Sequence, residues 1–173
     1  MSRYNRPMNP DRIDHILEQW QRELPQVDGS PLAVIGRVLR IARLLEKHRE
    51  TLLAEFGLSV WSFDLLATLR RQGPPYQLKP TDLYSLLMLS SGAMTNRIDR
   101  LEQDGTVVRL RDAGDRRSVI VQLTPKGVEL ADAVMPVLFA KEHELLAQFA
   151  APEELEALVP LLRRFLLSLE ETV

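Results

Sequence analysis

The sequence contains no cysteine among its 173 residues. Disulfides, thiolate metal sites, nucleophilic thiols and thiol-based redox sensing are therefore excluded. Histidine is also scarce: the chain has three, His15, His48 and His143, and no two of them lie three to five residues apart. A metal site built on a pair of histidines is therefore not expected, and we expect no cofactor.

Long apolar runs and a strong charge of one sign are missing as well. No run approaches the roughly 18 apolar residues that a membrane span needs, and the first residues, MSRYNRPMNPDR, lack the apolar core of a secretory signal. We therefore expect a cytoplasmic protein without membrane contact. Because the net charge is −2, overall charge gives no argument for nucleic-acid binding, which has to rest on local pattern.

The spacing of apolar residues predicts a mainly helical chain with one small β-hairpin. Helices are expected over residues 10–24, 30–57, 60–72, 80–87, 92–104, 125–149 and 152–170, and the hairpin over 106–123. Ser30 and Ser59 are predicted as N-caps, and Gly105 as the residue that ends the fifth of these helices.

Two short helices joined by a turn at residues 88–91, with a hairpin behind them, are typical of a winged helix-turn-helix. The second helix would lie in the major groove of DNA, and Ser, Thr, Asn and Arg suit phosphates and base edges. The predicted DNA contacts are Ser90, Ser91, Ala93, Thr95, Asn96, Arg97 and Arg100 on the helix and its turn, and Arg111, Arg116 and Arg117 on the hairpin. The alternative is a solvated helix face and a polar hairpin loop, since residues 90–117 also contain five acidic side chains beside six arginines.

The stretch from residue 90 to residue 127 resembles the MarR family of bacterial regulators. The motifs that carry the resemblance are TNRIDRLE at residues 95–102, DRR at 115–117 and LTPKG at 123–127. The resemblance extends over nearly the whole chain and implies an obligate homodimer, joined through its terminal helices, that binds a palindromic operator as a repressor. It also implies a division into a dimerisation segment (1–57), a winged helix-turn-helix (58–123) and C-terminal dimerisation helices (124–173).

The first helices are similar to those of the urate-responsive, PecS-like branch of that family, which has an extra N-terminal helix. The resemblance implies a ligand site formed by Trp20, Asp64, Arg97 and Arg109. Urate is a flat purine derivative, largely anionic at neutral pH, which a tryptophan ring could stack on and an arginine fork could bind. The sequence departs from the pattern at Thr106, where a large apolar residue is usual, and in the long connection GPPYQLKP.

Several alternatives stay open. Trp20 could be a packing residue, Asp64 could point outward, Arg97 could contact DNA alone, and Arg109 could pair with a nearby acid. The effector could be a phenolic or other aromatic acid instead of urate. A helical protein-interaction module without DNA binding is a remoter alternative. An enzyme is not expected, because no Ser-His-Asp order, phosphate-binding glycine loop or paired carboxylate stands out.

Overall fold

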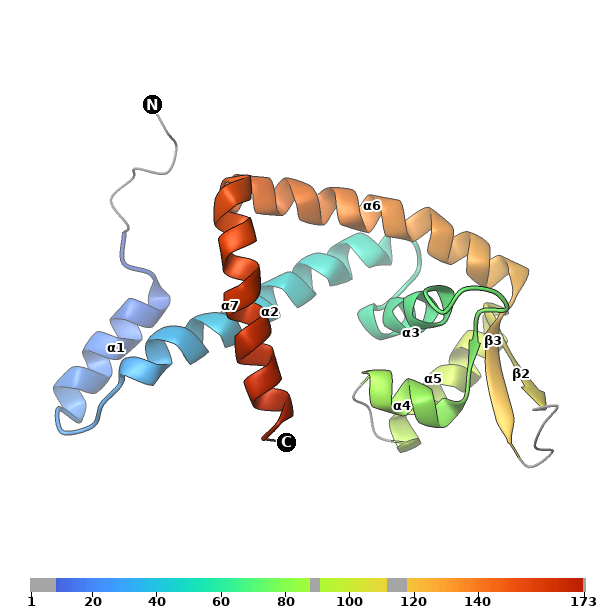
Figure 1. The fold of residues 1–173 in the computed structure, drawn as a ribbon, viewed down its shortest axis with the longest axis horizontal. Coiled ribbons are helices and arrows are strands. Elements are labelled where there is room, and N and C mark those ends of the chain that lie inside the picture. The colour runs from blue at the N-terminus through green and yellow to red at the C-terminus, as the bar shows by residue number, and fades with distance from the viewer. Residues whose placement is uncertain (1–8, 88–90, 112–117, 173) are drawn as a thin grey trace. The chain divides into compact units, whose positions relative to one another are not determined.

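The computed structural model describes residues 9–87, 91–111 and 118–172, and of residues 91–94 it describes the backbone only. Its elements are α1 (Arg12–Glu23), α2 (Ser30–Ala54), α3 (Val60–Arg70), β1 (Gln77–Leu78), α4 (Pro80–Leu87), α5 (Ser91–Gln103), β2 (Val107–Arg111), β3 (Val119–Leu123), α6 (Pro125–Phe149) and α7 (Pro152–Glu170) (Figure 1). The prediction of a mainly helical winged helix-turn-helix is confirmed.

The chain forms two compact units. One comprises residues 41–138, and the other comprises residues 1–40 together with residues 139–173. The boundaries between the units fall within α2 and α6. The sequence predicts a different division, into dimerisation and DNA-binding segments with boundaries at residues 57 and 123. That functional division stays a prediction.

The unit of residues 41–138 is built around a core to which α3, α4, α5 and the sheet all contribute. Its most deeply buried side chains are Leu53, Leu65, Leu66, Leu69, Leu83, Ile98, Leu101, Val107, Val121, Val134 and Leu138. The prediction that Ser59 caps α3 is confirmed, and the structure shows that the cap is reciprocal: Ser62 N donates to Ser59 Oγ at 3.3 Å, and Ser59 N donates to Ser62 Oγ at 2.8 Å. The cap fixes where α3 begins, and therefore which of its side chains face the core.

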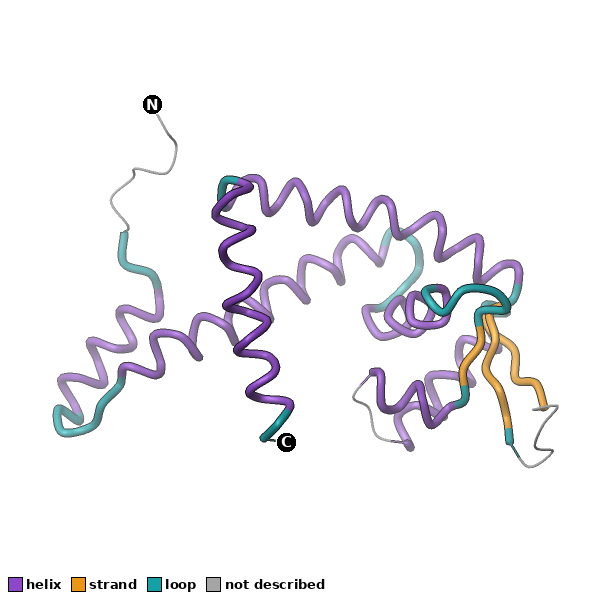
Figure 2. Tube along the Cα trace, in the orientation of Figure 1, coloured by secondary structure: helices purple, strands orange, loops and turns teal. Residues whose placement is uncertain are grey.

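The sheet has three antiparallel strands in the order β1-β3-β2, which lie side by side in Figure 2. Strands β2 and β3 form the predicted hairpin, with Arg109 opposite Val121. Strand β1 was missed, because the connection at residues 73–80 was read as a loop. Its two residues pair with β3, Gln77 with Gln122 and Leu78 with Val121, and so short a strand has no period that a sequence could reveal.

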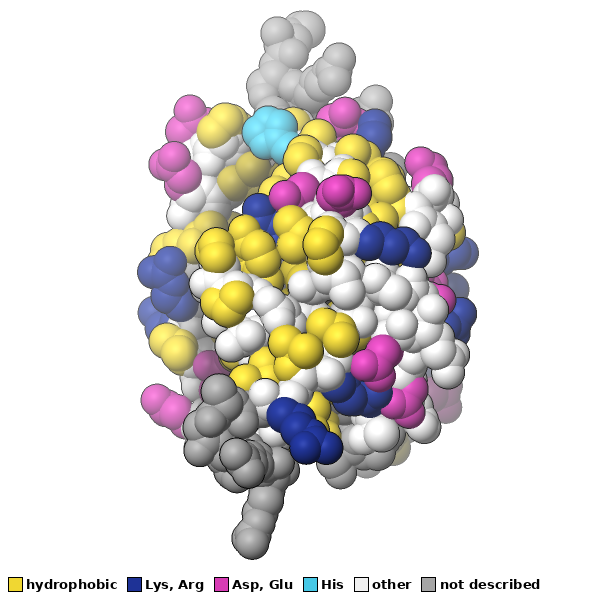
Figure 3. Space-filling view, turned by 90° about the vertical axis from the view of Figure 1, so that its right-hand side faces the viewer, with side chains coloured by type: hydrophobic (Ala, Val, Ile, Leu, Met, Phe, Trp, Pro, Cys, Tyr) yellow, Lys and Arg dark blue, Asp and Glu magenta, His cyan; other side chains and the backbone are white. Residues whose placement is uncertain are grey.

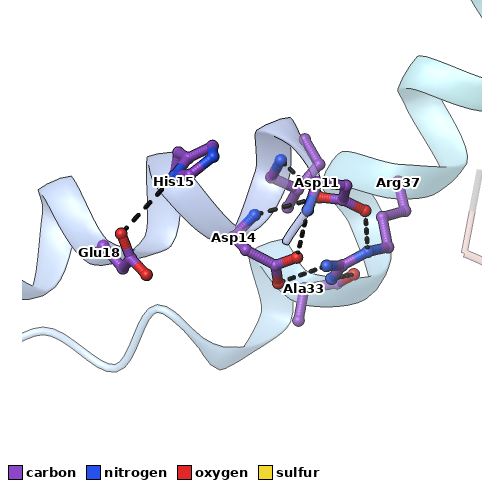
Figure 4. Close-up of polar contacts among 7 residues, drawn as sticks. Asp11, Asp14, His15, Glu18, Ala33 and Arg37 are labelled. Atoms are coloured by element: carbon purple, nitrogen blue, oxygen red, sulfur yellow. Dashed lines mark hydrogen bonds and ion pairs between the residues drawn. The ribbon is translucent and has the colours of Figure 1, made fainter. Parts of the chain in front are cut away.

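Helix α1 is fastened to the start of α2 by one arginine (Figure 4). Asp11 caps α1, since its Oδ1 accepts from Ile13 N at 2.7 Å and from Asp14 N at 3.1 Å. Arg37 of α2 then donates from Nε to Asp11 Oδ2 at 2.8 Å and from Nη2 to Asp14 Oδ1 at 2.5 Å. This pairing with Arg37 holds the pKa of the Asp14 carboxyl below its usual range.

The start of α2 differs from the prediction of Ser30 as its N-cap. Helix α2 already includes Ser30, and Asp28 accepts from Ser30 N at 2.9 Å and from its hydroxyl at 3.0 Å. An aspartate two residues before a helix can accept from the free N–H groups of its first turn. Asp28 therefore takes the capping role that was predicted for Ser30.

Helices α1, α2 and α7 leave large apolar side chains exposed in the single chain. Trp20 is 51% exposed, Val34 58% and Leu166 56%, and none of the residues of α7 is buried. In the part of the chain that the structure describes, no helix is long and apolar enough to cross a membrane.

Candidate nucleic-acid interface and effector site

Helix α5 has one buried side and one exposed side. Ile98 and Leu101 are 2% and 1% exposed and anchor the helix in the core. Thr95, Asn96 and Arg100 are exposed on the other side. Side chains of these types can bond to phosphates and base edges, and their contact with DNA stays a prediction.

The other predicted DNA contacts are placed less fully. Arg111 is exposed at the end of β2. Ser91 and Ala93 belong to the described backbone of α5, while Ser90, Arg116 and Arg117 lie outside the described residues. On the face drawn in Figure 3, basic and acidic side chains are interspersed. Within residues 90–117, five acidic side chains accompany six arginines, so DNA binding through this segment would depend on particular contacts and not on a uniformly basic surface.

Two arginines of α5 lie over the ring of Trp61, which belongs to the first turn of α3. The guanidinium carbon of Arg97 is 5.4 Å from the ring centroid, and that of Arg100 is 6.0 Å away. Both distances suit cation–π attraction. Sequence reasoning missed this role of Trp61, because the two helices come together only through the fold. The spacing of the two arginines by three residues was the available signal, since it puts them on the same helix face.

Asp64 lies on α3 in the same unit, partly buried between core residues. Burial raises the pKa of its carboxyl, and the positive charges of Arg49, Arg71 and Arg97 oppose that rise. Burial disfavours the ionised form of this carboxyl, and the surrounding arginines favour it. Asp64 and Arg97 thus interact electrostatically.

Arg109 of β2 ties the hairpin to α5. Its guanidinium lies 2.5 Å from Asp99 and 2.6 Å from Glu102, and its backbone N–H donates to Glu102 at 2.9 Å. That backbone bond and the guanidinium hold the pKa of Glu102 below its usual range. Since both carboxylates come from α5, Arg109 sets the position of the hairpin relative to the recognition helix. An anion bound at Arg109 would compete with these carboxylates for the guanidinium.

Trp20, the fourth residue of the predicted ligand site, lies in the unit formed by residues 1–40 and 139–173. It borders a hollow of about 940 Å³ together with Leu17, Leu24 and Val27. The volume falls in the range of small-molecule sites, roughly 300–1,000 Å³. Trp20 thus has a half-exposed ring beside an apolar hollow. The other three residues belong to the other unit, where Asp64 interacts with Arg97 while Arg109 pairs with Asp99 and Glu102. In the described part of the chain, no group of three or more His, Asp or Glu side chains is placed to hold a metal ion.

Comparison with known proteins agrees with this architecture. Residues 58–119 match the MarR family. The chain is 37% identical over 142 residues to the HTH-type transcriptional regulator PecS of Dickeya dadantii (strain 3937). This alignment covers 82% of this chain and 86% of PecS.

The fold is similar to two solved structures. One is AbsC, a MarR family transcriptional regulator from Streptomyces coelicolor, with a TM-score of 0.75, 26% identity, and coverage of 84% of this chain and 97% of that chain. The other is a mutant of MarR from E. coli complexed with operator DNA, with a TM-score of 0.69, 23% identity, and coverage of 85% and 97%. At the latter identity the likeness shows the fold alone. Taken with the recognition helix, its hairpin and the match over residues 58–119, the similarity to PecS establishes that this chain belongs to the MarR family of transcriptional regulators.

Proposed function

We propose that this protein is a homodimeric repressor that binds a palindromic operator and is released from it by a small aromatic or purine anion, with urate the best candidate. The observation that supports this most directly is the construction of α5. The helix exposes Thr95, Asn96 and Arg100 on one side, while Trp61 and Arg109 hold it from two neighbouring elements. A helix that is exposed for recognition and held through charged contacts is suited to be moved by an anion.

The proposed DNA contacts divide by position. Side chains at the start of α5 and its turn would read base edges in the major groove, and arginines of the hairpin would enter the minor groove, where negative potential concentrates. The proposed set is Ser90, Ser91, Ala93, Thr95, Asn96, Arg97 and Arg100 for the helix, with Arg111, Arg116 and Arg117 for the hairpin.

Dimerisation would cover the exposed apolar side chains of the terminal helices. On α7, Val159, Leu161, Leu162, Leu166, Leu167 and Leu169 are 48–56% exposed. A monomer in water rarely leaves so many large aliphatic side chains uncovered on one helix. A second copy offers the same apolar face, and two-fold symmetry would match that of a palindrome.

The proposed effector site consists of Trp20, Asp64, Arg97 and Arg109. The ring of Trp20 would stack on a flat ligand, and Arg97 or Arg109 would pair with its negative charge. An anion near Asp64 is repelled unless the carboxylate accepts from ligand N–H groups, as the purine N–H groups of urate allow. The ligand would engage Arg97, displace Asp64 and shift α5, and it lowers DNA affinity only if it binds that shifted state better.

The test is a gel-shift titration on the DNA upstream of the gene, at one fixed salt concentration, with and without urate. Salt is fixed because phosphate contacts make affinity steeply salt-dependent. We expect tight binding that urate weakens about 5- to 150-fold, the usual range of allosteric coupling. Trp20→Leu, which removes the stacking ring, and Asp64→Asn should lose that weakening, whereas Glu129→Gln, an exposed change on α6, should keep it.

Other outcomes would redirect the proposal. Operator binding could be unaffected by urate and yet be weakened by a phenolic acid. If that weakening is lost when Trp20 or Asp64 is replaced, the effector belongs to the alternative class, the phenolic acids. An unchanged urate response in both variants would refute the proposed site. Failure to bind any DNA would refute the regulator itself.

A further inference from the structure

The end of helix α5 is held by two residues at the start of α6. The amides of Gly105 and Thr106 close α5 by donating to carbonyls within it, each at 3.0 Å. Lys126 Nζ donates to the Asp104 carbonyl at 2.6 Å. Thr124 donates twice, from its hydroxyl to the Gly105 carbonyl at 2.7 Å and from its N–H to the Thr106 carbonyl at 3.1 Å. These three bonds from Thr124 and Lys126 form what we call the α5–α6 junction.

The hydroxyl of Thr124 serves both helices with one oxygen atom. Besides donating to the Gly105 carbonyl, it accepts from Gly127 N at 3.1 Å and so caps the first turn of α6. A hydroxyl can donate one bond and accept others, so both contacts can be made together. Because they meet at the same atom of a partly buried side chain, a shift of α5 against α6 would strain one of them.

Lys126 adds a charge to the junction. The last carbonyls of a helix carry a partial negative charge, which a nearby cation stabilises. Lys126 supplies that cation from outside α5, since it lies one position after the first residue of α6. Thr124 and Lys126 thus hold the end of α5 by two different kinds of contact.

Helix α6 leads from the junction to the surface proposed for dimerisation. It ends at Phe149, and its residues from 139 onward belong to the other unit. There Leu146 and Phe149 are 46% and 63% exposed, as expected of side chains that a second copy would cover. A dimer binds two half-sites at a set separation. The junction therefore determines how readily each α5 can move toward a half-site that is placed differently.

We propose that Thr124 and Lys126 are positioning residues that make the dimer selective for the spacing of its two half-sites. One base pair added at the centre of an operator moves a half-site by about 3.4 Å and turns it by about 35°. A firmly held α5 cannot follow that displacement without loss of the junction contacts, so the altered operator is rejected. This inference rests on the proposed function, dimeric binding to a palindrome, whereas the junction itself can be measured without DNA.

The experiment compares gel-shift affinities for the operator and for the same operator with one base pair inserted at its centre, at one fixed salt concentration. Thr124→Val removes the hydroxyl and keeps the shape of the side chain, while Thr124→Ser keeps the hydroxyl. Loss of one hydrogen bond corresponds to a factor of roughly 2–12 in an equilibrium. We expect the ratio of the two affinities to fall by such a factor in Thr124→Val and to stay near the parent value in Thr124→Ser. A general loss of stability would lower both affinities together and leave their ratio unchanged.

Lys126→Met separates positioning from direct contact with DNA. Loss of a phosphate contact would reduce the slope of log affinity against log salt by about 0.9 per protomer. A positioning role instead leaves the slope unchanged and lowers the spacing ratio. Lys47→Met, the same change at an exposed position of α2, should alter neither quantity. A reduced slope with an unchanged ratio would make Lys126 a phosphate contact and overturn its positioning role.

Amide hydrogen exchange of the full chain without DNA measures the junction directly. Thr124→Val and Lys126→Met should speed exchange at residues 104–106 by roughly 2–12-fold, and Thr124→Ser should change it little. Faster exchange with an unchanged spacing ratio overturns the selectivity. If Thr124→Val does not fold, an unchanged ratio and unchanged exchange in Lys126→Met overturn the proposal. Absence of operator binding by the parent would refute the proposed function and the selectivity with it, while exchange would still decide whether Thr124 and Lys126 hold α5.

Discussion

Among the glycines whose surroundings the structure describes, Gly127 has the least room, and its replacement by alanine gives the sharpest test of the packing. The residue is the third of α6 and belongs to the LTPKG motif. A Cβ atom added there would lie 2.0 Å from the Thr106 carbonyl oxygen and 3.0 Å from its carbon. Both are backbone atoms of the segment that leads into β2, so no side-chain rotation can relieve the contact.

The cost follows from the distance. Helix α6 would have to move away by roughly 1.3 Å, the difference between 2.0 Å and an ordinary C···O contact of about 3.3 Å. Overpacking of this kind costs about 1–3 kcal/mol and occasionally more. The same movement strains the bond from Thr124 N to the Thr106 oxygen, now 3.1 Å long. Alanine regains about 1 kcal/mol from its helix propensity.

We therefore expect Gly127→Ala to lower the free energy of unfolding by about 2 kcal/mol, the upper end of the overpacking cost less the gain in helix propensity, which lowers Tm by about 4–8 °C for a chain of this size. The assay is thermal unfolding followed by circular dichroism, at one fixed protein concentration because dimerisation makes Tm depend on concentration. Operator binding is measured below the transition.

Gly36→Ala is the matched control. A Cβ at Gly36 would meet Leu32 Cδ1 at 3.1 Å and Ile13 Cδ1 at 3.2 Å, which are the movable ends of side chains. Its Tm should stay within a few degrees of the parent. Equal stabilities of Gly127→Ala and the parent, or a larger loss in Gly36→Ala, would refute the reasoning.

Three further predictions concern the charged contacts. Arg109→Gln should weaken operator binding about tenfold in a gel shift, because the hairpin loses its ion pairs to α5; unchanged affinity would contradict its positioning role. Burial raises the pKa of Asp64, so its contribution to stability is present at acidic pH and is lost as pH rises through the raised value. Asp64→Asn should therefore raise the urea midpoint near neutral pH and change it little in acidic buffer. Arg37→Met should reduce hydrogen-exchange protection of α1. Because Arg37 lowers the pKa of Asp14, that difference should be largest near neutral pH and shrink as pH falls through the lowered pKa.

The sequence was sufficient where the signal is local. The helix over residues 80–87, the Ser59 cap and the turn at Gly105 were all predicted, and Gly105 has a φ of +72°. Each of these depends on a few neighbouring residues: a capping hydroxyl, a helix-starting proline, or a glycine that tolerates positive φ. Their physical cause is contained in a short window of sequence.

The contacts that shape the site depend on distant residues and were harder to predict. Trp61 meets Arg97 and Arg100 only because α3 and α5 pack on a common core. Strand β1 follows Tyr76, which has a φ of +60° that a tyrosine seldom adopts, and it is held by pairing with residues about 45 positions away. For Arg109, pairing with a nearby acid was one of the sequence alternatives, and the structure shows two such acids.

The arginines at the recognition helix serve both the fold and the proposed site, and this double use makes ligand control physically reasonable. Arg97 lies over Trp61 and interacts with Asp64, and Arg109 holds the hairpin on α5. An anion that binds either guanidinium competes with a contact that holds α5 in place. A hundredfold loss of DNA affinity corresponds to about 2.7 kcal/mol, which is the size of one or two hydrogen bonds to charged groups at about 1.5–3 kcal/mol each. Exchange of the partners of a single arginine is therefore enough to account for release from DNA, without unfolding any element of the winged helix.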